Sequence, residues 1–134
     1  MFSHFITAQD PIYETVLDEL HAGDKQTHWM WFIFPQLRAL GRSAMAQKFG
    51  IGDLDEARAY LAHPVLGARL RECTALVLAV SDRTAHEIFG SPDDLKFRSS
   101  MTLFAHAAPD DPLFKTVLDR YFDAQADPNT LDRI

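Results

Sequence analysis

The chain has 134 residues, 47% of them hydrophobic, which is enough for one domain with a substantial core and no need of disulfides or structural metal. Its formal net charge is −6 with acidic and basic residues intermixed, which argues against the clustered cationic surface that nucleic acid requires. No apolar run approaches the ~20 residues of a membrane span, and no signal-peptide pattern is present. We therefore expect a single cytoplasmic domain over residues 1–134 that binds neither nucleic acid nor membrane.

The first and last strong patterns in the chain are those of amphipathic helices. Residues 12–20 carry apolar side chains at helical intervals, with acidic residues on the opposite face. Asp10 and Pro11 are predicted to cap this helix and to occupy its first turn, and Gly23 is predicted to end it. The same arrangement recurs over residues 111–122, which also begin with Asp-Pro.

Further helices are predicted between these two. They begin at capping signals or prolines, and cover residues 53–61, 64–80, 84–90 and 91–107. No hairpin signal or sustained period-2 alternation is present, and residues 29–34, although strand-compatible in type, would have no strand to pair with. The sequence thus predicts an all-α fold, a compact single-domain bundle of about six to eight helices with a buried aromatic central helix.

That aromatic segment, residues 25–36, contains both tryptophans and is framed by Lys25, His28 and Gln36. With Thr27 as the N-cap, His28 falls in the first helical turn, where the helix dipole disfavours the imidazolium form. A neutral imidazole donates one hydrogen bond and accepts another, which suits ligand orientation or general-base catalysis. The alternative is a core histidine bonded to a backbone carbonyl. For the aromatic side chains, packing in the core is favoured over a stacking platform.

The predicted helix after residue 91 contains three hydroxyl side chains within four residues, Ser99, Ser100 and Thr102. Such side chains compete for backbone hydrogen bonds and lower helix propensity, so their presence needs an explanation. The favoured explanation is that these small residues let two helices pack closely. The alternative explanation is that they form the wall of a polar pocket. Lys96 lies one turn earlier, so a lysine-activated serine is a further, less favoured alternative.

Metal and cofactor signatures are absent from the sequence. The six histidines show no paired ligand spacing, and one cysteine cannot supply a thiolate site, so we expect no metal and no cofactor. Cys73 falls within an apolar helical pattern and is predicted to be buried and inert. The glycines at 50 and 52 are followed by acidic residues, which would repel phosphate, and no lysine-serine pair completes a P-loop.

Several runs match one known family: THWMWFIFPQL (27–37), LGRS (40–43), positions within 56–70, and DLKFRSSMTLF (94–104). They resemble the bacterial family known as the domain of unknown function numbered 1810, some members of which carry a calpastatin label. The resemblance implies an all-α fold and no established activity, and it marks the His28 and Lys96 helices as the distinctive parts of the family. Protease inhibition has no physical support in this sequence, because calpastatin is a disordered chain, whereas this chain is predicted to be globular. Residues 94–97 are also similar to domains that act on ADP-ribose and related N-ribosides.

The leading hypothesis is a pocket for a small polar or anionic ligand between the His28 helix and the Lys96 helix, with these two residues as catalytic candidates. The expected ligand-binding residues are Lys25, Arg42 and Lys96 for charge, His28 and Gln36 for directional hydrogen bonds, Ser43, Ser99 and Thr102 for finer contacts, and Trp31 as a wall. A protein-interaction module or homodimer without a small ligand is the alternative, and a hydrolase acting on ADP-ribose or a related N-riboside is the second alternative. The sequence does not decide whether the protein is an enzyme.

Overall fold

The computed structural model describes residues 2–134, and these residues form ten α-helices and one 3-10 helix with no strand. The elements are α1 (Ser3–Gln9), α2 (Tyr13–Ala22), α3 (Met30–Ile33), η1 (Arg38–Leu40), α4 (Ala44–Phe49), α5 (Leu54–Ala62), α6 (Leu66–Ala79), α7 (Ala85–Phe89), α8 (Asp93–Ala107), α9 (Pro112–Tyr121) and α10 (Pro128–Leu131). Six of the α-helices have seven or more residues. The predicted all-α fold is confirmed.

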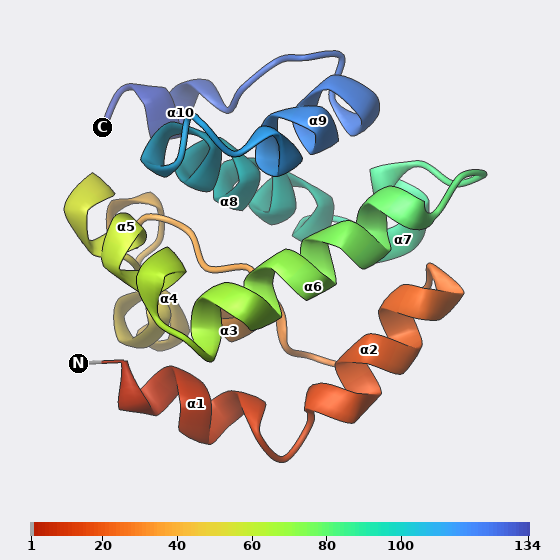
Figure 1. Ribbon diagram of the computed structural model, residues 1–134, viewed down its shortest axis with the longest axis horizontal. Coiled ribbons are helices and arrows are strands. Elements are labelled where there is room, and N and C mark those ends of the chain that lie inside the picture. Colours follow the sequence, from red (N-terminus) through yellow and green to blue (C-terminus); the bar gives the residue numbers. More distant parts are fainter. Residues whose placement is uncertain (1) are drawn as a thin grey trace.

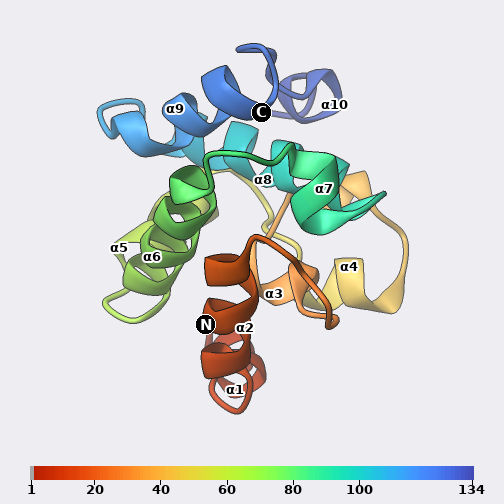
Figure 2. The same cartoon turned by 90° about the vertical axis from the view of Figure 1, so that its right-hand side faces the viewer.

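The helices surround a short central turn. Helices α8, α9 and α10 lie together at one end of the molecule, α1 and α2 lie at the other, and α6 runs between them (Figure 1). Helix α8 packs on α9 and α5, while α6 contacts α2, α5 and α9. The view turned by 90° shows α3 and α4 on the side of α2 away from α5 and α6 (Figure 2). Helix α3 contacts α1, α4, α6 and α8, so the aromatic segment occupies the middle of the bundle.

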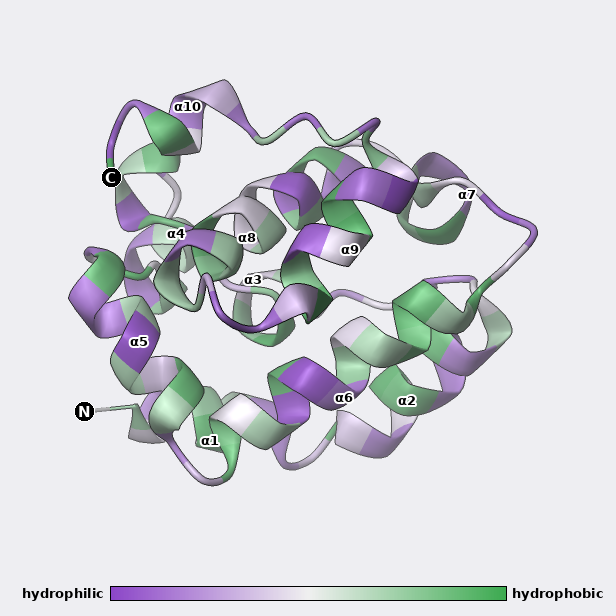
Figure 3. Cartoon of the chain, turned by 45° about the horizontal axis from the view of Figure 1, so that its top comes forward, coloured by the Kyte–Doolittle hydropathy of each residue, from purple (hydrophilic) through white to green (hydrophobic). Residues whose placement is uncertain are grey.

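The predicted last helix forms as the sequence indicates. The Asp111 carboxylate accepts a hydrogen bond from the backbone N–H of Leu113 at 3.1 Å, and Pro112 occupies the first helical position of α9. The apolar stripe of α9 is buried at Phe114 and Val117, and the Phe114 ring packs against Phe104 of α8 with centroids 5.8 Å apart. Hydrophilic and hydrophobic residues alternate around α6 and α9, the pattern expected of helices with one buried face (Figure 3).

The predicted cap of the first long helix is wrong. The chain already forms α1 before it, and Asp10 is the C-cap of α1, whereas α2 begins at Tyr13 without a side-chain cap. The Asp10 carboxylate instead pairs with the guanidinium of Arg69 on α6 at 2.9 Å. A tertiary ion pair therefore takes the side chain that local sequence assigned to a cap. The predicted end is confirmed, because Gly23 adopts a left-handed conformation with φ 65°.

The middle helices begin close to their predicted signals. The Asp53 side chain accepts from the backbone N–H of Glu56 at the start of α5, and Thr84 with Glu87 forms a complete capping box at the start of α7. Helix α8 ends at the predicted Ala107. Four short elements, α1, η1, α4 and α10, were not predicted, because helices of three to seven residues give too few turns for a periodic pattern.

Residues 29–35 of the aromatic segment are central and, except for the half-buried Trp31, buried as predicted, but the helix there is a single turn. Helix α3 begins at Met30, with Trp29 as its N-cap residue, so His28 lies in the preceding loop rather than in a first helical turn. Thr27 caps nothing, because its hydroxyl donates to the carboxylate of Glu19 at 2.7 Å. The helix-dipole argument for a neutral imidazole therefore does not apply to His28.

The core is dominated by aromatic side chains. Trp29 is 1% exposed, and Phe34 packs edge-on against Phe97 with ring centroids 4.9 Å apart. Cys73 is buried as predicted, and burial raises the pKa of its thiol to about 12. Across residues 2–134, every helix is too short or too polar to cross a bilayer.

Candidate functional site

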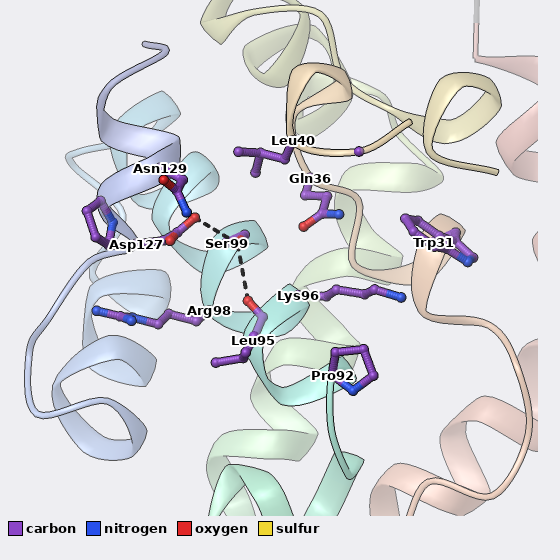
Figure 4. Close-up of a pocket in the computed structure, with 12 residues that line it drawn as sticks. Trp31, Gln36, Leu40, Pro92, Leu95, Lys96, Arg98, Ser99, Asp127 and Asn129 are labelled. Atoms are coloured by element: carbon purple, nitrogen blue, oxygen red, sulfur yellow. Dashed lines mark hydrogen bonds between the residues drawn. The ribbon is translucent and has the colours of Figure 1, made fainter. Parts of the chain in front are cut away.

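A hollow lies between α3 and the segment that follows it, the N-terminal half of α8 and the start of α10. We call it the main cleft, and its volume is about 460 Å³. It is lined by Trp31, Gln36, Leu40, Gly41, Pro92, Leu95, Lys96, Arg98, Ser99, Asp127, Pro128 and Asn129 (Figure 4). Three segments that are far apart in the sequence thus bring polar groups and an indole ring to the main cleft.

One wall of the main cleft is made by Lys96 and Trp31. The Lys96 ammonium nitrogen lies 3.9 Å from the centre of the indole ring, within cation–π range. Its nearest carboxylate oxygen, Oδ1 of Asp93, is 3.6 Å away, and 24% of the lysine side chain remains exposed. Lys96 therefore carries a positive charge that is only partly matched by its neighbours.

A second, smaller hollow lies on the other side of this wall. We call it the small hollow; its volume is about 110 Å³, and it is lined by Lys25, His28, Trp29, Met30, Trp31, Asp93 and Lys96. Here Nζ of Lys25 pairs with Oδ2 of Asp93 at 2.8 Å, and only 6% of the Lys25 side chain is exposed. Two lysines thus share the single carboxylate of Asp93, which leaves this group one positive charge in excess.

The loop that carries Lys25 and His28 is held in place by Glu19 of α2. One carboxylate oxygen of Glu19 accepts the backbone N–H groups of Gln26 and Thr27 and the indole N–H of Trp29, at 2.8–3.0 Å. Partial burial disfavours the ionised form, but these hydrogen bonds outweigh it and hold the pKa of Glu19 below its usual value. A single ionised side chain thereby fixes the loop beside the small hollow.

The opposite wall of the main cleft is formed by Ser99 and Asp127. The Ser99 hydroxyl lies 2.8 Å from Oδ2 of Asp127 and 3.1 Å from the backbone carbonyl of Leu95 (Figure 4). Asp127 is the N-cap of α10, and the same oxygen accepts from the backbone N–H and the hydroxyl of Thr130 at 3.2 and 2.6 Å. The carboxylate at the start of α10 is thus attached to α8 by a side-chain hydrogen bond.

Arg98 lines the main cleft but points away from its centre. Its guanidinium donates to the backbone carbonyls of Gln125 at 2.8 Å and Ala126 at 3.0 Å, where Figure 4 shows it extended toward the segment before α10. Arg98 therefore holds the 125–126 segment against α8.

Gln36 reaches the main cleft from an extended segment. Its backbone carbonyl accepts the N–H of Ile51 at 2.9 Å, next to an isolated parallel bridge between Leu37 and Ile51. This bridge holds the chain between α3 and η1 against the strand-like residues before α5. The Gln36 side-chain amide points into the main cleft in Figure 4, so it can donate or accept a hydrogen bond there.

The structure brings six of the nine predicted site residues to the two hollows. Trp31, Gln36, Lys96 and Ser99 line the main cleft, and Lys25 and His28 join Trp31 and Lys96 around the small hollow. The predicted neighbourhood of His28 and Lys96 is therefore present, although His28 is not on a helix.

The remaining three predicted residues line neither hollow. Arg42 is exposed, and the Ser43 hydroxyl caps α4 by accepting from the backbone N–H of Ala46. Thr102 is buried, where its hydroxyl donates to the carbonyl of Arg98 and accepts the N–H of Asp127 at 2.9 Å. These assignments are corrected, because Ser43 and Thr102 stabilise local structure and Arg42 is exposed outside both hollows.

Sequence analysis did not select Asp127, although a signal was available. Asp127-Pro128 repeats the Asp-Pro helix start of Asp111-Pro112, and in both cases the structure shows an aspartate cap followed by proline. The close approach of this second cap to Ser99 depends on the path of the chain after α9. No group of three or more His, Cys, Asp or Glu side chains within residues 2–134 is arranged to hold a metal ion.

A family model described as "Protein of unknown function (DUF1810)" matches residues 1–134. The chain belongs to this family. The DUF1810 resemblance inferred from the sequence motifs is thus confirmed. The chain is also similar to a solved structure, the conserved hypothetical protein Rv1873 from Mycobacterium tuberculosis, with 51% identity over 98% of this chain and 94% of that chain and a TM-score of 0.96. No curated protein matches the sequence.

Proposed function

We propose that this DUF1810 protein binds a small polar anion in the main cleft, with Lys96 as its principal charged contact. The observation that carries the proposal is the position of the Lys96 ammonium, over Trp31 and 3.6 Å from the nearest carboxylate oxygen. A partly exposed ammonium in a hollow with an aromatic wall and few polar groups has the composition of a small-molecule site. An incoming anion gains a full charge partner there at little cost in existing contacts.

The polar groups around Lys96 favour a ligand of limited size. Gln36 and Asn129 bring side-chain amides to the main cleft, and Leu40, Leu95 and Pro92 give it apolar walls. A volume of about 460 Å³ falls within the range of typical ligand sites. The site therefore suits a small molecule with one anionic group and an apolar or flat part.

The small hollow supplies additional positive charge beside the main cleft. Lys25 and Lys96 both approach Asp93, so displacement of Lys96 toward a ligand leaves Asp93 paired with Lys25. His28 lines the same hollow and offers a further hydrogen bond from the loop that Glu19 holds. The arrangement lets Lys96 change partners without leaving a carboxylate unpaired.

Calorimetric titration with inorganic phosphate and pyrophosphate tests the proposal. The wild-type chain is expected to bind at least one of these anions, and Lys96→Met should weaken binding about tenfold or more, because it removes the charge and keeps the aliphatic stem. Lys115→Met is the matched control, since Lys115 pairs with Asp119 on α9 outside both hollows. Failure of both anions to bind, or equal affinity in Lys96→Met, would overturn the proposal.

A further inference from the structure

We infer that Asp127 makes the main cleft selective for anions that also carry a hydrogen-bond donor, a hydroxyl or an amino group. The inference rests on the proposed function and adds to it the polarity of the ligand's second end. It assigns Asp127 as a specificity-determining residue opposite Lys96. The argument depends on how the two carboxylate oxygens of Asp127 are used.

One oxygen of Asp127 is fully engaged with protein groups. Oδ2 accepts the Thr130 hydroxyl at 2.6 Å, the Thr130 backbone N–H at 3.2 Å and the Ser99 hydroxyl at 2.8 Å. No side chain within residues 2–134 donates to Oδ1, and the residue lines the main cleft. The backbone N–H of Asn129 also bonds to this carboxylate, but the two oxygens together can accept about four hydrogen bonds, so Oδ1 can still accept one from a ligand.

The position of this carboxylate is fixed by the backbone on either side. The N–H of Asp127 donates to the Thr102 hydroxyl at 2.9 Å, and Arg98 donates to the carbonyls of residues 125 and 126. These contacts tie the segment before α10 to two successive turns of α8. A ligand that bonds to Oδ1 would meet a group already in place, which lowers the entropic cost of binding.

Asp127 is held in its ionised form. Partial burial disfavours the charge, but the hydrogen bonds from Thr130 and Ser99 outweigh it and keep the pKa of Asp127 below its usual value. An ionised carboxylate only accepts hydrogen bonds, so any ligand group next to Oδ1 has to donate one. An anionic group placed there would be repelled.

The two charged walls together set the orientation of the ligand. Lys96 attracts the anionic end toward Trp31, and Asp127 attracts the donor end toward α10 (Figure 4). Asn129 and Gln36 lie on the same cleft as neutral amides that can bond to either end. The ligand class that fits is a small phosphate or carboxylate with a hydroxyl or amino group at its other end.

Three phosphates of similar size separate the contribution of the phosphate group to binding from that of the hydrogen-bond donor. Glycerol 3-phosphate carries hydroxyl donors, phosphoethanolamine carries an amino donor, and propyl phosphate carries neither at its far end. The wild-type chain is expected to bind one or both donor-bearing phosphates about tenfold or more tightly than propyl phosphate, the effect expected of a hydrogen bond to a charged group. Which of the two binds more tightly identifies the donor as hydroxyl or amino.

The decisive variant is Asp127→Asn. In this variant the side-chain amide oxygen has to occupy the position of Oδ2, because Thr130 and Ser99 donate hydrogen bonds there. The NH2 group then occupies the position of Oδ1, so a hydrogen-bond acceptor is replaced by a donor. Asparagine is also a good N-cap, so α10 is expected to keep its start. Asp127→Asn should remove the preference for donor-bearing phosphates, whereas Asp132→Asn, outside the cleft on the same segment, should retain it.

The preference is a ratio of affinities within one variant, so partial unfolding of Asp127→Asn changes both affinities equally and leaves the ratio interpretable. A wild-type chain that binds propyl phosphate as tightly as the other two, or an unchanged ratio in Asp127→Asn, would contradict the role of Asp127 while leaving the anion site intact. Failure of all three phosphates to bind would overturn the proposed function itself, and the inference with it.

Discussion

The ammonium group of Lys96 lies 3.9 Å from the centre of the Trp31 ring, and this pair forms the wall that the main cleft and the small hollow share. The second tryptophan, Trp29, is 1% exposed and lies beneath Lys25 instead, at 5.0 Å. Each tryptophan thus reports on a different lysine. An event that moves Lys96 changes the surroundings of Trp31 and leaves those of Trp29 nearly unaltered.

Substitution of Lys96 is therefore expected to change tryptophan fluorescence. Lys96→Met removes a positive charge from the face of the Trp31 indole, so the emission maximum should shift relative to wild type. The shift should persist in a Trp29→Phe background and disappear in a Trp31→Phe background, as steady-state emission spectra would show. Lys115→Met should leave the spectrum unchanged, and a shift that survives Trp31→Phe would contradict the assignment.

The stability of the loop beside the small hollow should depend on the charge of Glu19. Glu19→Gln keeps an oxygen for the N–H groups of Gln26, Thr27 and Trp29, but it loses the charge that strengthens these hydrogen bonds. We expect a loss of about 1 kcal/mol in the free energy of unfolding, measured by urea denaturation. Glu14→Gln, at an exposed position of the same helix, should cost much less; an equal loss in both variants would argue against the anchoring role.

The stability that Glu19 contributes should also depend on pH. Its pKa is lower in the folded chain than its ordinary value of 4.5, so the unfolded chain binds more protons as the pH falls through this region. The contribution is fully present above about pH 4.5 and is lost as the pH falls through the lower folded value. The difference in unfolding free energy between wild type and Glu19→Gln should therefore shrink below pH 4.5. A difference that stays constant down to pH 3 would contradict the shift.

Most of the fold could be predicted because its helices carry their own start and stop signals. The Asp111 cap, the Thr84 capping box and the left-handed Gly23 are local features whose geometry follows from a few neighbouring residues. Asp10 and Thr27 were misassigned for a shared reason. Each has the residue type of a cap, but a distant partner, Arg69 or Glu19, takes its side chain in the folded chain.

The candidate site could be predicted only in part. The aromatic segment and the Lys96 helix stand out by composition, and the structure brings Trp31 and Lys96 into contact. Arg42 is close to the aromatic segment in sequence, yet it is exposed, in the segment between η1 and α4. Asp127 comes to Ser99 only through the path of the chain after α9, and no local pattern specifies that path.

The hydroxyl-rich stretch of α8 contains two buried side chains with opposite expected effects on stability. The Ser100 hydroxyl is buried and has no hydrogen-bond partner within residues 2–134, whereas the Thr102 hydroxyl bonds to Arg98 and Asp127. Ser100→Ala should leave the free energy of unfolding unchanged or raise it, because it removes a polar group that gains nothing in the folded chain. Thr102→Val keeps the shape but leaves the Asp127 N–H without its acceptor, which should cost about 1–3 kcal/mol.

Urea denaturation of the two variants measures this contrast directly. Thr102→Val should also weaken the attachment of the segment before α10, so amide hydrogen exchange at Asp127 should become faster in this variant and stay unchanged in Ser100→Ala. A destabilised Ser100→Ala variant would show that the Ser100 hydroxyl has a partner in solution. Unchanged exchange at Asp127 in Thr102→Val would show that Arg98 and Ser99 hold the segment without Thr102, because their bonds to residues 125–127 remain in that variant.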